Sequence, residues 1–301
     1  MSFFKNRKIN KLLDKASKQK DLYRAVENYK KIIELDDSFP AIYNYIALCY
    51  FELNDYQLSE EYFKKAIEKF NDDFKSKVEV YYNLAFALHS QNKYKDAQKY
   101  YEKAIEEDPS YSFTYKNFGY LLFSDKQYKK ALKTFKKFLT FNEDAETYNN
   151  IAIIYEELNN NKEAIKCYNL AIKTDNTYAL AYNNLGAIYM AEKKYKKAGE
   201  LFDKAIENDR SLVDAYNNLA TINFIDKKYN LSLSLYQKAL KIAPYNKSIR
   251  ANIAQVYYYL NDINNCTLYL KELINQGYPI NLILDHKDFK KIDNLKELIT
   301  S

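Results

Sequence analysis

The sequence repeats itself with a period of 34 residues. Ala181 and Ala215 each begin the segment Ala-Tyr-Asn-Asn-Leu, and the two segments are 34 positions apart. Each is followed by Lys-Lys-Tyr, ending at Tyr195 and Tyr229, and then by an aromatic residue with Ala three positions later. A fixed period of this length is typical of proteins that stack copies of one small structural motif. We therefore expect an elongated array.

In this register the chain divides into eight repeats followed by a tail. The repeats span about residues 6–39, 40–77, 78–111, 112–144, 145–178, 179–212, 213–246 and 247–280. The second repeat carries four extra residues near Asn71–Lys77, and the fourth is one residue short. Both changes fall between repeats, where a change of length costs little. We predict an array over residues 1–280 and a helical capping tail over residues 281–301, which covers the end of the last repeat.

Each repeat has the pattern of two amphipathic helices. Position 28, counted from the first residue of the repeat, is Ile or Leu throughout, and with the usually aromatic position 24 it forms an apolar stripe with helical spacing. Position 20 is small in every repeat, which indicates close approach of two helix backbones; it holds Ala25, Ser59, Ala97, Ala131, Ala164, Ala198, Ser232 and Cys266. Only four Gly and four Pro leave few turn residues for a strand-rich fold. The predicted class is all-α, with helix pairs that bury their apolar faces by stacking.

This pattern resembles the tetratricopeptide repeat family over nearly the whole chain. In the sixth repeat the matching residues, at positions 4, 7, 8, 11, 20, 24 and 27, are Tyr182, Leu185, Gly186, Tyr189, Ala198, Phe202 and Ala205. Pro109 and Pro244 stand at position 32, where most other repeats lack the family's proline, and Ile9 and Arg250 replace the position-4 aromatic residue in the terminal repeats. The resemblance implies a right-handed α-solenoid whose first helices line a concave groove.

Asparagine recurs at position 6 of six consecutive repeats. The residues are Asn83, Asn117, Asn150, Asn184, Asn218 and Asn252. Asn is a poor helix former, whereas its amide offers both donors and an acceptor to the backbone of an extended peptide. The series resembles the asparagine ladders of some peptide-binding arrays of this family. Position 12 is often aromatic and would supply apolar sockets beside the ladder; it holds Phe51, Phe123, Phe224 and Tyr258. We predict that these ten residues form a peptide-binding groove.

An alternative reading of the asparagines stays open. Asn is abundant throughout the chain, and repeats arise by duplication, so the six residues are not independent observations. They could be an inherited and merely solvated feature of the repeat. The sequence does not decide between the two interpretations.

Residues that could support catalysis or hold a cofactor are sparse. The chain has two histidines, His89 and His286, and three cysteines, Cys49, Cys167 and Cys266, which lie far apart and form no CxxC motif. Isolated glycines form no loop that could cradle a phosphate, and an odd, scattered set of cysteines argues against a disulfide framework or a zinc site. We predict a protein that is not an enzyme and has no catalytic residues, cofactor or metal.

Charge and hydropathy argue against two further classes of partner. The net charge is +6, from 46 basic and 40 acidic residues, and the two signs are interleaved, whereas a nucleic-acid-binding protein gathers its basic residues on one face. No apolar stretch approaches the roughly 18 residues of a membrane span, and no apolar segment of signal-peptide length follows the N-terminus. We expect neither a nucleic-acid nor a membrane partner, and a cytoplasmic location.

The expected function is that of a protein-interaction scaffold or adaptor that binds an extended peptide or a partner protein in the concave groove. A structural role through self-assembly, or a role as targeting subunit of a larger and possibly enzymatic complex, stays open; we expect a monomer or a weak homo-oligomer. Arrays of the family that clamp the acidic C-terminus of chaperones need Asn, Lys and Arg where this chain has Tyr120, Leu180 and Asn184. That partner is not expected, and the sequence identifies no other.

Overall fold

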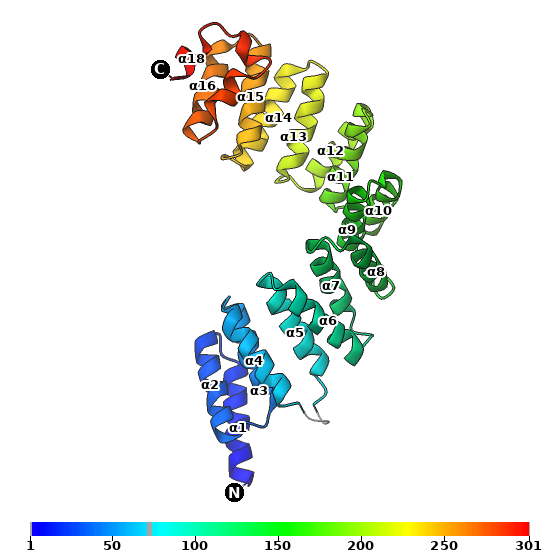
Figure 1. Cartoon of the computed structure of the whole chain (residues 1–301), viewed down its shortest axis with the longest axis vertical. Helices are drawn as coiled ribbons and strands as arrows, with labels where there is room; N and C mark the ends of the chain where they lie inside the picture. Colours follow the sequence, from blue (N-terminus) through cyan, green and yellow to red (C-terminus); the bar gives the residue numbers. More distant parts are fainter. Residues whose placement is uncertain (1, 71–73, 301) are drawn as a thin grey trace. The chain divides into compact units, whose positions relative to one another are not determined.

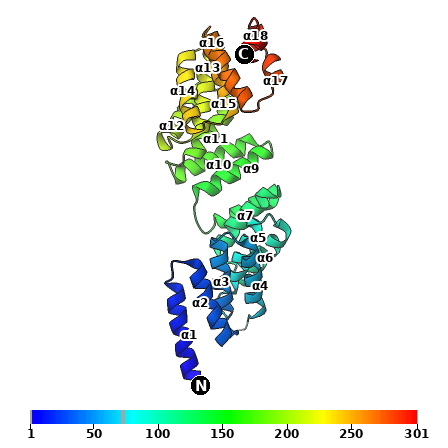
Figure 2. The ribbon, with the colours of Figure 1, turned by 90° about the vertical axis from the view of Figure 1, so that its left-hand side faces the viewer.

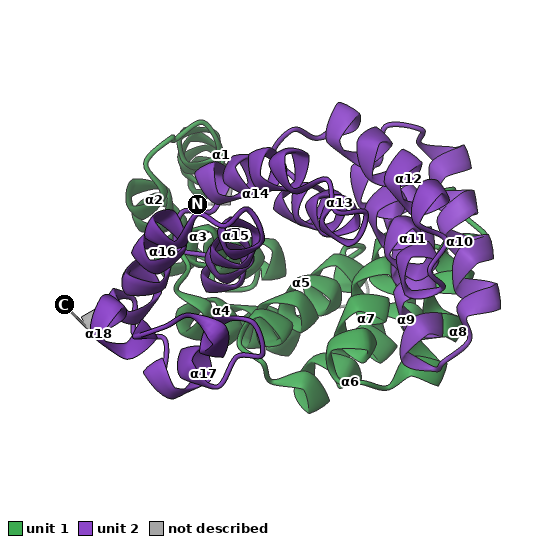
Figure 3. Ribbon diagram, turned by 90° about the horizontal axis from the view of Figure 1, so that it is seen from above, with its two compact units in different colours: residues 1–143 green, residues 144–301 purple. Residues whose placement is uncertain are grey.

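The protein is all-helical in residues 2–70 and 74–300, the part of the chain that its computed structural model describes. The predicted all-α, solenoid-type fold is confirmed, because the helices follow one another as packed pairs. Residues 71–73, within the predicted insertion at Asn71–Lys77, lie outside the described residues. The helices are labelled in chain order in Figure 1, and the chain separates into two compact units, residues 1–143 and 144–301 (Figure 3).

Unit 1 contains four helix pairs in its described residues (Figure 2). They are α1 (Ser2–Ser17) with α2 (Leu22–Leu35), α3 (Pro40–Glu52) with α4 (Tyr56–Glu68), α5 (Lys77–Ser90) with α6 (Tyr94–Glu107), and α7 (Ser112–Ser124) with α8 (Tyr128–Phe138). Each pair contacts the next through its second helix: α2 packs on α3, α4 on α5, and α6 on α7.

Unit 2 continues the same arrangement and ends in the tail. Its described pairs are α9 (Ala145–Glu157) with α10 (Asn161–Thr174), α11 (Ala179–Ala191) with α12 (Tyr195–Asn208), α13 (Val213–Ile225) with α14 (Tyr229–Ile242), and α15 (Lys247–Tyr259) with α16 (Ile263–Asn275). The tail holds α17 (Ile280–Leu284), the 3-10 helix η1 (Phe289–Lys291) and α18 (Leu295–Thr300).

The two helices of each pair meet at small side chains. Every residue at position 20 is buried, and its exposed fraction ranges only from 0% to the 3% of Ala25, as expected where the two helices of a pair approach closely. One turn further along the second helix, the position-24 rings of Tyr168 and Phe202 are fully buried. Burying such a ring stabilises the fold by about 1.5–3 kcal/mol, which makes these contacts a main source of stability for each pair.

The turn inside each pair uses a left-handed backbone conformation. Position 15 has φ between +56° and +60° in seven repeats; the residues are Asn54, Asn92, Lys126, Asn159, Lys193, Lys227 and Asn261. The next N–H then reaches back to the carbonyl at position 11, as Lys194 N does to Tyr189 O at 2.8 Å. This closes the first helix with the hydrogen bond of a Schellman motif. Lysine tolerates the conformation at a cost of about 1–2 kcal/mol.

The tail packs on the last helix pair. Ile283, Phe289 and Leu295 share one buried cluster with Leu270 and Leu273 of α16. These contacts bury apolar side chains of α16 against the tail.

A buried carboxylate ties the tail to α15. Asp288, only 3% exposed, accepts hydrogen bonds from Gln255 Nε2 at 2.7 Å and from the Tyr259 hydroxyl at 3.2 Å. Burial opposes the ionisation of this carboxyl, but the two hydrogen bonds and the charges of His286 and Lys287 outweigh burial and hold its pKa below the ordinary 3.8. The charged form of Asp288 therefore stabilises the docked tail.

Gly186 in α11 makes room for a phenylalanine ring, whereas Gly199 in α12 does not. A Cβ on Gly186 would lie 2.7 Å from Phe202 Cε1, well inside van der Waals contact. A Cβ on Gly199 would meet only Leu219 Cδ1, at an ordinary 3.8 Å. The sequence places both glycines inside helices, and only the packing separates them.

Alanine substitution should therefore change stability in opposite directions at the two glycines. Gly186→Ala forces the Phe202 ring to move and should lower the free energy of unfolding by about 1–3 kcal/mol. Gly199→Ala gains helix propensity without a clash and should raise it by about 0.5–1 kcal/mol. Urea denaturation followed by circular dichroism measures both, and shifts in the same direction would contradict the packing argument.

The lowered pKa of Asp288 predicts an acid-sensitive tail. A carboxyl whose folded-state pKa is depressed contributes stability above its unfolded pKa, and this contribution is lost as the pH falls through the folded value. The protection factors for amide hydrogen exchange in η1 and α18, which correct for the intrinsic rate at each pH, should therefore fall in the wild type below about pH 3.8, whereas Asp288→Asn should show weaker protection at neutral pH and a flatter pH profile. Identical pH profiles for the two proteins would refute the role of the charge.

Candidate functional site

The six position-6 asparagines lie on the first helices of successive pairs. Unit 1 carries Asn83 on α5 and Asn117 on α7; unit 2 carries Asn150, Asn184, Asn218 and Asn252 on α9, α11, α13 and α15. All six are half-buried. First helices of neighbouring pairs contact one another, as α5 contacts α7 and α11 contacts α13. The asparagines within a unit therefore follow one another from helix to helix.

Four of these side chains donate a hydrogen bond to position 5 of the preceding repeat. The bonds join Asn117 Nδ2 to Tyr82 Oη (2.6 Å), Asn184 Nδ2 to Asn149 Oδ1 (3.0 Å), Asn218 Nδ2 to Asn183 Oδ1 (3.1 Å), and Asn252 Nδ2 to Asn217 Oδ1 (3.3 Å). We call these four bonds the amide rungs. Each rung spans 35 residues of sequence and ties two repeats together.

The rungs occupy only part of the hydrogen-bonding capacity of the asparagines. A carboxamide has two N–H donors and a carbonyl oxygen with two lone pairs, and a rung uses one donor. Asn184 Oδ1 also accepts a bond from Asn183 Nδ2 at 3.2 Å. Because the side chains are half-buried, a ligand could still reach groups that the rungs leave unused.

Sequence reasoning missed the role of position 5, although a signal for it was present. The dipeptide Asn-Asn occupies positions 5 and 6 in the fifth, sixth and seventh repeats, so acceptor and donor recur together. The equivalent acceptor in the second repeat is Asn44. The four-residue insertion at the end of this repeat separates it from the position-6 asparagine of the third repeat. Its buried Oδ1 has no hydrogen-bond partner among the described residues, so no rung forms on it.

The predicted aromatic sockets are already packed by neighbouring rings. Phe51 lies 5.3 Å from Tyr56 and 5.3 Å from Phe86 of the next repeat, between ring centroids. Phe224 likewise lies 5.5 Å from Tyr229 and 5.2 Å from Tyr259. Each unit thus has an aromatic cluster formed by two first helices and the start of a second helix, whose outer surface rather than an open socket is available to a ligand.

The other two predicted aromatic residues differ from each other. Phe123 packs on Tyr128 at 6.1 Å between ring centroids. This is the same contact within a helix pair that Phe51 makes with Tyr56. Tyr258 packs against the buried cluster that α15, α16 and the tail share, and its ring lies 5.4 Å from the Tyr259 ring. At this end of unit 2 the predicted aromatic residue therefore already takes part in packing.

Glu156 is a charged residue of the candidate groove that sequence reasoning overlooked. It occupies position 12, where four other repeats have Phe or Tyr. Its Oε1 accepts a hydrogen bond from the hydroxyl of the fully buried Tyr168. Asn184 also interacts with that hydroxyl. Burial raises the pKa of Glu156, although the bond from Tyr168 opposes the shift. Burial and the nearby carboxylate raise the pKa of Tyr168 in turn.

Two of the cysteines and one histidine are shielded from solvent by burial. Burial, and next the charge of Asp262, raises the pKa of the Cys266 thiol to about 12, which keeps the nucleophilic thiolate scarce. Burial also raises the pKa of Cys49 and lowers the pKa of His89. Among residues 2–70 and 74–300, no three His, Cys, Asp or Glu side chains converge as metal ligands would, and no helix is long and apolar enough to cross a membrane.

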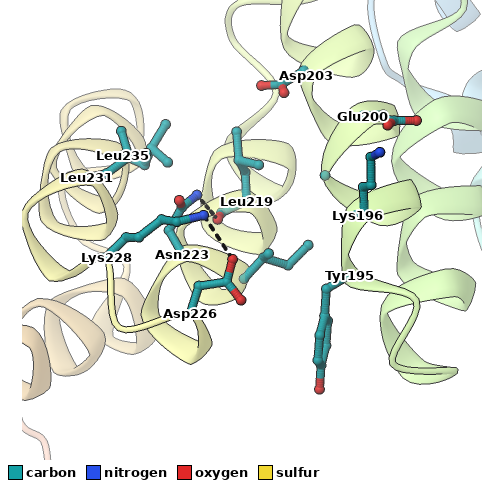
Figure 4. Close-up of a pocket in the computed structure, with 12 residues that line it drawn as sticks. Tyr195, Lys196, Glu200, Asp203, Leu219, Asn223, Asp226, Lys228, Leu231 and Leu235 are labelled. Atoms are coloured by element: carbon teal, nitrogen blue, oxygen red, sulfur yellow. Dashed lines mark hydrogen bonds and ion pairs between the residues drawn. The ribbon is translucent and has the colours of Figure 1, made fainter.

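A separate crevice lies between α12, α13 and α14 (Figure 4). Its volume is about 590 Å³. Position 11, which holds tyrosine in several repeats, is Asn223 here, and Gly199 adds no side chain on the facing helix. The α12 wall carries Glu200 and Asp203, and burial raises the pKa of Asp203. This crevice shares no residue with the asparagine series or the aromatic clusters.

Models of the tetratricopeptide repeat match most of the repetitive part of the sequence. One matches residues 38–106 and 177–243, a second matches residues 154–192, and a third matches residues 100–133. A search of curated proteins finds no significant match.

Several solved structures share the fold. The C-terminal part of a TPR repeat-containing protein from Cytophaga hutchinsonii is 18% identical, with a TM-score of 0.64 over 81% of this chain and 97% of that one. The pilF protein of Pseudomonas aeruginosa is 18% identical, with a TM-score of 0.60 over 72% and 96% of the two chains. A chain of the APC/C hetero-tetramer Cut9-Hcn1 is 14% identical, with a TM-score of 0.58 over 93% of this chain and 52% of that one.

The amide rungs predict a stability cost that needs no ligand. Asn218→Ala removes the donor and leaves the buried Asn183 Oδ1 without that partner, so the free energy of unfolding should fall by about 1–3 kcal/mol. Asn230→Ala on the exposed surface of α14 is the matched control and should leave stability nearly unchanged. Chemical denaturation measures both. Equal stability of the two variants would show that the rung contributes nothing.

Proposed function

Because this chain belongs to the tetratricopeptide repeat family, we propose that it is a protein-interaction scaffold that binds an extended peptide segment along the first helices of its pairs. The observation that carries the proposal is the series of half-buried amides at position 6. An extended backbone presents N–H and C=O groups in alternation. A carboxamide can satisfy either group, so a series of them can bind a peptide with little dependence on its side chains.

The amide rungs support this proposal by ordering the binding groups in advance. A free asparagine side chain loses rotamer entropy when it binds a ligand, at a cost of about 0.5–1.5 kcal/mol for each immobilised side chain. In Asn184, Asn218 and Asn252 the rung already restrains the rotamer. Part of the entropic cost is therefore met when the protein folds, and more of each new hydrogen bond contributes to affinity.

The surroundings of the amides determine which side chains such a peptide should carry. The aromatic cluster around Phe51 in unit 1 and the one around Phe224 in unit 2 favour apolar contacts. Between them in the sequence, Glu156 places a half-buried carboxylate beside the Tyr168 hydroxyl. A positively charged side chain or a backbone N–H of the ligand would stabilise the ionised form of Glu156.

Paired substitution of two asparagines tests the proposal. The probe is a fluorescent peptide selected from a random displayed library on the full-length chain. The variant Asn150→Ala with Asn184→Ala should weaken its binding by roughly 1–3 kcal/mol, from about 0.5–1.5 kcal/mol per lost hydrogen bond. Fluorescence anisotropy measures the dissociation constant, and circular dichroism at the same temperature confirms that the variant is folded.

The control pair is Asn169→Ala with Asn230→Ala, on the exposed surfaces of α10 and α14. It removes the same number of amides away from the first helices and should leave the dissociation constant unchanged. Unchanged affinity in the folded Asn150/Asn184 variant would refute the ladder. An equal loss in both pairs would show that the effect is not specific to the asparagines of the first helices.

A further inference from the structure

Helix α8 has an unusual concentration of positive charge. Its eleven residues include Lys129, Lys130, Lys133, Lys136 and Lys137 and no acidic residue. The corresponding second helices α4, α6 and α12 mix acidic with basic residues. The interleaving of charge expected from the sequence as a whole therefore fails in α8; α14 also lacks acidic residues, but it has only two lysines.

The stability of α8 does not account for this charge. Lysines four positions apart, such as Lys129 with Lys133 and Lys133 with Lys137, repel one another along the helix. Lysines in the first turn also oppose the helix dipole, which favours positive charge only in the last turn. In α4, by contrast, Lys64 pairs with Glu60 at 2.6 Å. Because α8 contains no acidic residue, it has no such pair within the helix, and helix stability does not explain why it carries so many lysines.

The lysines of α8 border a mainly apolar crevice. It has a volume of about 370 Å³ and lies between α6, α7 and α8, which are consecutive in unit 1 (Figure 1). Tyr115, Phe118 and Leu122 of α7 line it; their exposed fractions are 7%, 8% and 1%. A cavity of this size falls within the range of small ligand sites and can accept one bulky side chain.

Three charged side chains stand on one face of α8 beside these apolar residues. Lys130, Lys133 and Lys137 all line the crevice and follow the three- and four-residue spacing of a single helix face. The ammonium of Lys137 lies over the Phe141 ring, 4.9 Å from its centroid, which holds it near the protein surface. The one acidic residue of the lining, Glu102, accepts a hydrogen bond from Gln98 at 2.8 Å.

We propose that the crevice between α6, α7 and α8 binds an acidic segment of a partner protein. One bulky apolar side chain of the segment enters the crevice above Phe118 and Leu122, and flanking carboxylates pair with Lys130 and Lys133. The site is distinct from the asparagine series, because none of its lining residues occupies position 6 or position 12.

The combination of apolar floor and charged rim selects a peptide over a nucleic acid. A phosphate backbone would use the lysines but would gain nothing from Tyr115, Phe118 and Leu122. An acidic peptide with an apolar side chain uses both surfaces. The crevice between α12, α13 and α14 combines three acidic side chains with Lys196 and Lys228, so the same kind of location in unit 2 does not offer a basic rim.

A designed peptide tests the proposal on the full-length chain. The probe is a short fluorescent peptide with a central Phe flanked by Asp and Glu residues. The competitors are the same peptide with Ala for Phe and a single-stranded oligonucleotide of equal charge. We expect saturable binding of the Phe peptide, and for each competitor we expect a dissociation constant at least tenfold higher. The variant Lys130→Glu with Lys133→Glu should raise the dissociation constant of the Phe peptide at least tenfold.

The matched control is Lys162→Glu with Lys173→Glu on α10, which changes the net charge equally at two exposed lysines. It should bind the Phe peptide within twofold of the wild type, and circular dichroism verifies the fold of both variants. Three outcomes would overturn the proposal: no saturable binding of the Phe peptide, equal binding of the Ala peptide or the oligonucleotide, or an equal loss in the control. None of them affects the asparagine ladder, since that test uses another peptide and other variants.

Discussion

Close approach of two helices at a small side chain is the contact on which the rest of the structure depends. Where position 20 is Ala, as in Ala164 and Ala198, the second helix comes near enough for the position-24 ring to be fully buried against the first. A larger residue at position 20 would separate the helices and leave that ring without contacts. A single pair has apolar residues on more than one side, so some of them are buried only when the next pair packs on it. After α16 the tail packs on these residues instead.

This packing also determines where the polar groups can lie. Stacking brings position 6 of one repeat beside position 5 of the previous repeat, and the amide rungs form there because both residues are Asn or the acceptor is a tyrosine hydroxyl. The rungs serve stability and binding with the same side chains, so the two interpretations of the asparagines do not exclude each other. In the second repeat the arrangement is interrupted, and the buried carbonyl of Asn44 lacks a partner.

The positions that packing does not use carry the chemical differences between repeats. Position 12 is an aromatic residue in some repeats and Glu156 in another, and the outer surface of the second helices is basic in α8 but mixed in α12. Crevices between successive repeats have the same type of apolar walls but differ in charge, because the charged residues that border them lie on exposed helix faces that the packing does not use. One architecture can thus present several binding surfaces of different character.

The sequence by itself determined the helix pairs, the small residue at position 20 and the apolar stripe, because these follow from side-chain size and spacing within one repeat. It also located the asparagine series and the aromatic residues of position 12. Only the tertiary structure decided which side chains contact one another. Asn218 donates a hydrogen bond to Asn183, the Tyr168 hydroxyl donates one to Glu156, and the Asp288 carboxylate accepts one from Gln255 of α15. Such contacts join residues from different helices, and their geometry depends on how the helices stack, which no local spacing encodes.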